Sequence, residues 1–228
     1  MKRIINILTM AGLFALVGFP VFSGGRIDVV GNDSVRSFRE LLQNAPQLVT
    51  EDATNGGWSI SAPDNGARFI WSKNFASSPR FDVMLEIDAA PFIDAGLNPA
   101  LLPGNFVLAG NKLTVGTKLG NEQLQYQGQA TAIASYEHIV KLKRQSIGYH
   151  GAADHYGVNL GNGNLFEWAK ELKTNDKDIV FVLDPDALIR AGVDPDRING
   201  WLFAKVTVDD ENGRPVEVDK LLKPFDLL

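Results

Sequence analysis

An internal repeat constrains the fold of this chain of 228 residues more than any other feature of its sequence. Residues 82–105 and 178–201 align without a gap at a shift of 96 residues, and 7 of the 24 aligned positions are identical. The identical pairs are Asp82/Asp178, Asp88/Asp184, Ile93/Ile189, Ala95/Ala191, Gly96/Gly192, Pro99/Pro195 and Gly104/Gly200. Because self-similarity of this kind reflects a repeated structural unit, the chain is expected to contain one unit twice.

Each copy of the repeat has the pattern of a strand followed by a short helix. Apolar residues alternate over 82–87, which is typical of a half-buried strand, and the apolar run 179–183 predicts a strand buried on both faces. Asp88 and Asp184 are placed to cap the helices, and Pro185 suits a first helical position. Gly96 and Gly192 are expected to end the helices with a positive φ.

Weaker similarity extends the repeat in both directions. Helical spacing over 35–42 recurs at 133–140, and the Asn-Gly turns near residues 65 and 162 predict a hairpin in each copy, although 165–172 could instead be a short helix. Strand pairs are expected at 106–119 and at 201–218. The predicted fold is therefore α+β, with two tandem pseudo-symmetric repeats packed on each other: unit one over 27–125 and unit two over 129–228.

The first 23 residues are typical of a signal peptide. Lys2 and Arg3 precede an uncharged run from Ile4 to Phe22, and cleavage is expected before Gly24. The protein is therefore predicted to be secreted or periplasmic, with an uncleaved N-terminal anchor as the alternative. No second membrane span is expected.

Composition excludes several classes of function. The chain has no cysteine, which excludes disulfides, thiol catalysis and thiolate metal sites. The net charge is −5, and no basic patch with interleaved aromatic residues is present, so nucleic acid is not an expected partner. The motifs of serine hydrolases, P-loop proteins and Rossmann domains are also missing.

Four aspartates gather in the second copy, at Asp184, Asp186, Asp194 and Asp196. Their spacing does not match a calcium-binding loop of the helix-loop-helix type. Caps and partners of helix dipoles explain them better.

The three histidines are the clearest difference between the two units. His138, His150 and His155 lie within 18 residues of unit two, and unit one has none. Together with Asp154 they are the candidate ligands for a divalent transition metal, since imidazole and carboxylate are the ligands that a cysteine-free protein can offer.

Three aromatic residues are the candidate lining of a ligand pocket: Tyr149 and Tyr156 in the histidine segment, and Trp58 beside a Gly-Gly pair. Trp71 and Trp168, which occupy matching positions in the two units, are expected to belong to the core.

The sequence therefore favours an exported, non-catalytic binding or interaction protein, whose partner is a small ligand or another extracytoplasmic protein. The alternative is a metal- or haem-binding protein, or a metal-dependent enzyme, that uses the loop of His150 and His155.

Overall fold

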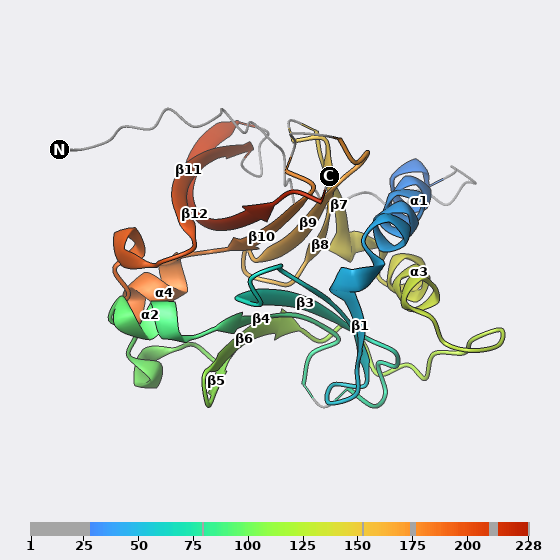
Figure 1. Ribbon diagram of the computed structural model, residues 1–228, viewed down its shortest axis with the longest axis horizontal. Helices are drawn as coiled ribbons and strands as arrows, with labels where there is room; N and C mark the ends of the chain where they lie inside the picture. The colour runs from blue at the N-terminus through green and yellow to red at the C-terminus, as the bar shows by residue number, and fades with distance from the viewer. Residues whose placement is uncertain (1–27, 79, 152, 174–176, 210–213, 228) are drawn as a thin grey trace.

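The computed structural model describes residues 28–78, 80–151, 153–173, 177–209 and 214–227, and the side chains of Val208 and Asp209 are not described. The predicted signal peptide therefore lies outside the described residues. Two six-stranded antiparallel sheets face each other, with α1 and α3 at one end of the molecule and α2 and α4 at the other (Figure 1). No helix within these ranges has both the length and the apolar character needed to span a membrane.

Unit one supplies the first sheet. Its elements are α1 (Val29–Asn44), β1 (Val49–Asp52), β2 (Gly57–Ser61), β3 (Ala67–Ser72), β4 (Val83–Asp88), α2 (Ala90–Asp94), β5 (Phe106–Ala109) and β6 (Lys112–Thr117). Short 3-10 turns at Pro46–Leu48 and Pro99–Leu101 follow α1 and α2.

Unit two supplies the second sheet. Its elements are α3 (Ala132–Leu142), β7 (Ile147–His150), β8 (His155–Asn159), β9 (Leu165–Ala169), β10 (Ile179–Leu183), α4 (Asp186–Arg190), β11 (Leu202–Asp209) and β12 (Pro215–Phe225). Its 3-10 turns lie at Arg144–Ser146 and Pro195–Arg197.

The two sheets have the same topology. The strand order is β1-β2-β3-β4-β6-β5 in unit one and, read from the equivalent edge, β7-β8-β9-β10-β12-β11 in unit two. This identity confirms the α+β fold and the tandem repeat.

Two predictions about individual elements need correction, and two strands were missed. β9 is a strand, so the alternative of a helix over 165–172 is wrong. β12 continues to Phe225 rather than ending near Val218, and β1 and β7 were not predicted. Pro224 is compatible with β12 because β11 begins at Leu202, opposite Leu222, which leaves the proline with a neighbouring strand on one side only.

The helices begin close to the positions predicted for them, with shifts of a few residues. The α1 helix begins at Val29, earlier than expected, because Asp28 accepts a hydrogen bond from the Gly31 N–H at 3.0 Å. Asp88 and Asp184 accept from the N–H groups two residues later, at 3.2 and 3.1 Å. Pro185 precedes the first helical residue of α4 instead of occupying it.

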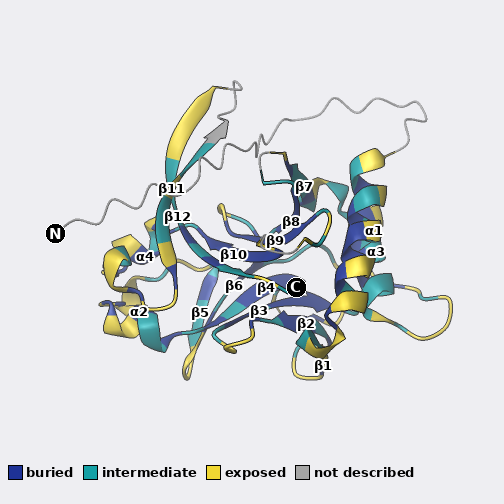
Figure 2. Ribbon diagram, turned by 45° about the horizontal axis from the view of Figure 1, so that its top comes forward, coloured by how far each residue is buried: buried dark blue, intermediate teal, exposed yellow. Residues whose placement is uncertain are grey.

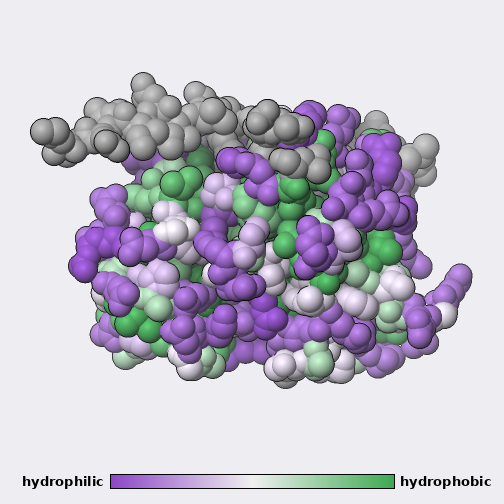
Figure 3. Space-filling view, in the orientation of Figure 1, coloured by the Kyte–Doolittle hydropathy of each residue, from purple (hydrophilic) through white to green (hydrophobic). Residues whose placement is uncertain are grey.

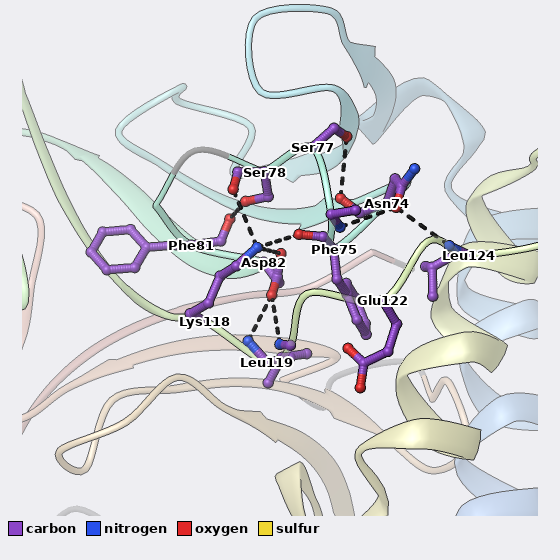
Figure 4. Close-up of polar contacts among 12 residues, drawn as sticks. Asn74, Phe75, Ser77, Ser78, Phe81, Asp82, Lys118, Leu119, Glu122 and Leu124 are labelled. Atoms are coloured by element: carbon purple, nitrogen blue, oxygen red, sulfur yellow. Dashed lines mark hydrogen bonds and ion pairs between the residues drawn. The ribbon is translucent and has the colours of Figure 1, made fainter.

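The repeated aspartates Asp82 and Asp178 are fully buried. Each accepts a hydrogen bond from the backbone of the segment that follows the last strand of its unit. The Asp82 carboxylate accepts from the Leu119 N–H at 2.7 Å and lies 3.0 Å from the Lys118 ammonium (Figure 4). Asp178 accepts from the Leu227 N–H at 2.7 Å. Because both carboxylates are buried with partners, their repetition reflects a structural function.

The two units share one core. Its buried apolar residues come from the facing sides of both sheets and from all four α-helices. Phe69 of β3 stacks on Phe166 of β9, with ring centroids 4.3 Å apart and an interplanar angle of 6°. Because these two residues occupy equivalent positions, their contact lies near a pseudo-two-fold axis. Trp71 and Trp168 are fully buried, as predicted.

The long helices are exchanged between the units. Ser37 of α1 donates to the Ala169 carbonyl of β9 at 2.9 Å, and Ser135 of α3 donates to the Ser72 carbonyl of β3 at 2.6 Å. Each helix is thus tied to the sheet of the other unit, which excludes an arrangement of two separate domains.

Candidate functional site

The structure brings His150 and His155 together on the outer face of the second sheet, which is the face turned away from the first sheet. The two residues are directly opposite each other on β7 and β8. Their side chains flank the carboxylate of Glu167 on β9, with Nδ1 to carboxylate oxygen distances of 3.4 Å for His150 and 3.8 Å for His155. All three residues are more than nine-tenths buried.

Glu167 is ionised in this setting despite its burial. Burial alone would raise the pKa of the carboxyl group, but the contacts with His150 and His155 outweigh it and hold the pKa below its ordinary value. The cluster therefore combines a buried negative charge with two imidazoles that can balance it. Nδ1 of His155 makes no hydrogen bond among the described contacts.

Glu167 is the functional candidate that sequence reasoning missed. Its place between Phe166 and Trp168 in a strand puts it on the outer face, because side chains alternate along a strand. That β9 lies next to β8, within reach of both histidines, follows only from the strand order.

The two predicted tyrosines also come together, but they face the core. Tyr149 and Tyr156 are directly opposite each other, with ring centroids 5.2 Å apart, and Tyr156 is buried. The Tyr149 hydroxyl donates to Asp154 at 2.6 Å, and this hydrogen bond raises the pKa of Tyr149 to about 12. Asp154 is thereby directed toward a tyrosine, whereas the carboxylate beside the two imidazoles belongs to Glu167.

The remaining predicted site residues lie elsewhere. His138 is on α3, where its ring meets Tyr126 edge to face. Trp58 is on β2 of the first sheet and is half-buried beneath the Lys73 ammonium. Across the residues that the structure describes, no three side chains of ligand type are arranged to hold a metal ion. The metal site therefore stays a prediction.

Two shallow hollows lie away from the histidines. One, of about 140 Å³, is on the outer face of the first sheet and includes Arg80, Met84 and Glu86. The other, of about 460 Å³, lies between α1 and α3 and is lined by Asp28, Glu137 and Arg144 among others. Ion pairs already engage Arg144 with Asp28 and Glu137 with Arg39 at this second hollow.

The outer faces of the two sheets differ in chemistry. In unit one, Arg68 lies between Asp52 and Glu86 and forms an ion pair of 3.0 Å with each. In unit two, the positions equivalent to Arg68 and Glu86 are Leu165 and Val182. These two residues form an apolar cluster with Val180 and Leu222. At these two positions the scaffold therefore carries charged side chains in unit one and apolar side chains in unit two. Figure 3 shows hydrophilic and hydrophobic residues intermixed on one side of the molecule.

A second difference is a long two-stranded ribbon in unit two, formed by Lys205–Asp209 of β11 and Pro215–Asp219 of β12. The equivalent hairpin of unit one pairs four residues on each strand and turns at Gly110-Asn111, whereas β11 pairs with β12 over eight residues. Because β10 pairs with β12 only from Leu221 onward, the ribbon extends beyond the sheet without a third strand among the described residues. Figure 2 shows it projecting from the body with exposed residues along its length.

The ribbon has one apolar side and one charged side. Val206, Val216 and Val218 are on the side that continues the outer face of the sheet, and Val216 is 37% exposed. On the other side, Lys205 and Asp219 lie opposite each other and form an ion pair of 3.2 Å.

Comparisons with known proteins give no relatives. No model of a known protein family matches the chain, and neither a curated protein nor a solved structure shows similarity to it.

Proposed function

We propose that this protein is an exported, non-catalytic interaction protein that binds an extended segment of another polypeptide along β11. The observation that supports the proposal is the ribbon, because it is where unit two departs most from the topology that both units share. Duplicated scaffolds keep their framework in both copies and carry function where the copies differ.

The physical argument concerns the free edge of β11. An edge strand presents a row of N–H and C=O groups that an added strand can pair with, and native proteins usually keep such edges short or covered. β11 has eight residues, whereas the other edge strands, β1, β5 and β7, have four each. A two-stranded ribbon on its own is only marginally stable in water, so a third strand would stabilise it.

The chemistry of the ribbon suits such a partner. Val206 of β11 offers an apolar contact to the side chains of an added strand, and Val216 and Val218 continue the apolar side behind it on β12. Lys205 offers a charge on the opposite side, where it pairs with Asp219. Backbone pairing supplies affinity in this mode of binding, and the alternating side chains supply selectivity.

The binding test uses a variant in which residues 206–218 are replaced by Gly-Asn. The two-residue turn then joins the paired residues Lys205 and Asp219, as Gly110-Asn111 joins the paired residues Ala109 and Lys112 in unit one. The probe is an array of short synthetic peptides with alternating apolar residues. We expect a subset of these peptides to bind the native protein and to lose binding to the trimmed variant.

Melting temperatures of the two proteins are the control for folding. Equal binding of all peptides by both folded proteins, or binding by neither, would refute strand addition at β11.

Export rests on the pattern of Lys2, Arg3 and the uncharged run that follows. We expect N-terminal sequencing of the exported protein to begin near Gly24. Recovery of the chain from the cytosol with Met1 retained would contradict this part of the proposal.

A further inference from the structure

We propose that Leu202 selects the segment that binds along β11, by packing against a bulky apolar side chain of the added strand. This inference rests on the proposed function and names the chemistry of its ligand. The ligand is an extended polypeptide segment with two adjacent apolar residues, one placed beside Leu202 and the other beside Phe203.

Leu202 ends an apolar row that crosses the outer face of the second sheet. Each residue of this row lies directly opposite the next one, from β9 through β10 and β12 to β11: Leu165, Val182, Leu222 and Leu202. Leu165 and Val182 are buried, whereas Leu202 is 46% exposed at the edge. An added strand would place a side chain opposite Leu202 on the same face and so continue the row.

The corresponding row of unit one has a different chemistry. It runs through the same order of strands and consists of Arg68, Glu86, Thr114 and Val107. Arg68 and Glu86 form an ion pair of 3.0 Å, and the edge strand that carries Val107 has four residues. The apolar row is therefore found in the unit that also has the long edge strand.

An exposed leucine is unusual at a sheet edge that stays unpaired. Native proteins commonly protect such edges with charged residues or proline. No strand lies beyond β11 within the described part of the chain, and Leu202 is the first residue of that strand. The position is therefore suited to a partner that covers it.

The opposite face of the sheet offers a second apolar contact at the next position. Phe203 lies opposite Leu221, which lies opposite Leu183, and Leu221 and Leu183 are fully buried. Phe203 itself is partly buried against the shared core. Because successive side chains of a strand point to opposite faces, an added strand meets apolar surface on both faces at this point. Two adjacent apolar residues in the segment satisfy both contacts.

Farther along β11 the two faces differ. Val206 keeps the outer face apolar, whereas Lys205 on the other face forms an ion pair with Asp219. The rest of the segment is therefore expected to alternate between apolar and polar residues. The adjacent apolar pair at one end distinguishes the proposed ligand from a simple alternating strand.

The test varies each position of short synthetic peptides that have alternating apolar residues, and compares the native protein with Leu202→Lys. We expect the native protein to select peptides with the adjacent apolar pair. Leu202→Lys should weaken their binding at least about tenfold, because the burial of two apolar side chains is lost. The same variant should instead favour an acidic residue at that one peptide position, since opposite charges on facing residues stabilise a strand pair.

Two further variants control this exchange of specificity. Val107→Lys adds the same charge at the equivalent position of unit one and should leave peptide selection unchanged. Leu202→Thr keeps a residue that favours strands, so it should weaken the same peptides without favouring acidic ones. Melting temperatures verify that all the variants are folded.

The inference is overturned if Leu202→Lys and Leu202→Thr bind the same peptides as tightly as the native protein, or if Val107→Lys has an equal effect. A lack of preference for two adjacent apolar residues would also overturn it. The proposed function would survive these results as long as the trimmed variant loses peptide binding. Binding of no peptide by the native protein would refute the proposed function and this inference with it.

Discussion

Gly96 and Gly192 illustrate how one residue type can satisfy two demands. Both have positive φ, at 106° and 96°, as the helix-ending pattern predicts. They also face each other across the pseudo-two-fold axis: a Cβ on Gly96 would lie 2.7 Å from the Gly192 carbonyl oxygen, and a Cβ on Gly192 would lie 2.9 Å from that of Gly96. Nearby, the Asn98 and Asp194 N–H groups donate to the Ala191 and Ala95 carbonyls, which fixes this approach.

We therefore expect even Gly96→Ala or Gly192→Ala to lower the free energy of unfolding by on the order of 2 kcal/mol or more, and valine to cost more still. Gly110→Ala is the matched control, because Gly110 has a φ of 58° with open space around its Cβ position. It should cost only about 1 kcal/mol for the left-handed conformation. Urea unfolding measures all these changes, and equal losses at Gly96 and Gly110 would show that the cross-unit contact has no energetic weight.

Glu167 links stability to pH at the residue scale. Its folded-state pKa lies below the ordinary value of 4.5, so its ionised form stabilises the native state above that value. This contribution is lost as the pH falls from 4.5 through the lower pKa of the folded state.

We expect Glu167→Gln to be less stable than the native protein at neutral pH and to lose less stability on acidification below about 4.5. Urea unfolding at a series of pH values measures both effects. Parallel curves for the two proteins would contradict the coupling of Glu167 to His150 and His155.

At the scale of elements, the exchanged helices tie the two units together in addition to the packing of the two sheets. Ser37 and Ser135 are buried, and each satisfies a carbonyl at the end of a strand in the opposite unit. Phe38 and Tyr136, next to these serines, contact each other with ring centroids 4.2 Å apart. Helix packing and hydrogen bonds thus act at the same junction.

Replacing either Ser37 or Ser135 with alanine should lower the free energy of unfolding by about 1–3 kcal/mol, because each change leaves a buried carbonyl without its partner. Ser77→Ala, which removes an exposed hydroxyl, is the control and should be nearly neutral. Thermal unfolding of the three variants measures these losses of stability. Similar losses in all three variants would mean that Ser37 and Ser135 do not tie the units together.

At the scale of the whole molecule, the shared core predicts that the units are interdependent. A fragment of residues 24–125 would expose the face of the first sheet that packs on Phe166, and its α1 would lack β9. We expect this fragment alone to show no cooperative unfolding. Mixing it with a fragment of residues 126–228 should restore a cooperative transition, and a cooperative transition in either fragment alone would contradict the interdependence.

Sequence alone determined the features of this protein that depend on residues close together in the chain. The repeat, the capping aspartates, the glycines with positive φ and the hairpins around Asn-Gly turns all follow from local backbone preferences, which act within a few residues. The identical strand order then follows from the repetition of one unit.

Tertiary structure alone decided which elements meet. Glu167 faces His150 and His155 because three strands lie side by side, and α1 crosses to the second sheet because the apolar faces of the two units bury each other. Among the described residues, β11 likewise lies at the edge of the second sheet because of the strand order. These contacts join residues far apart in the chain, and local backbone preferences carry no information about them. Burial of apolar surface is non-directional, so it is satisfied only by the fold as a whole.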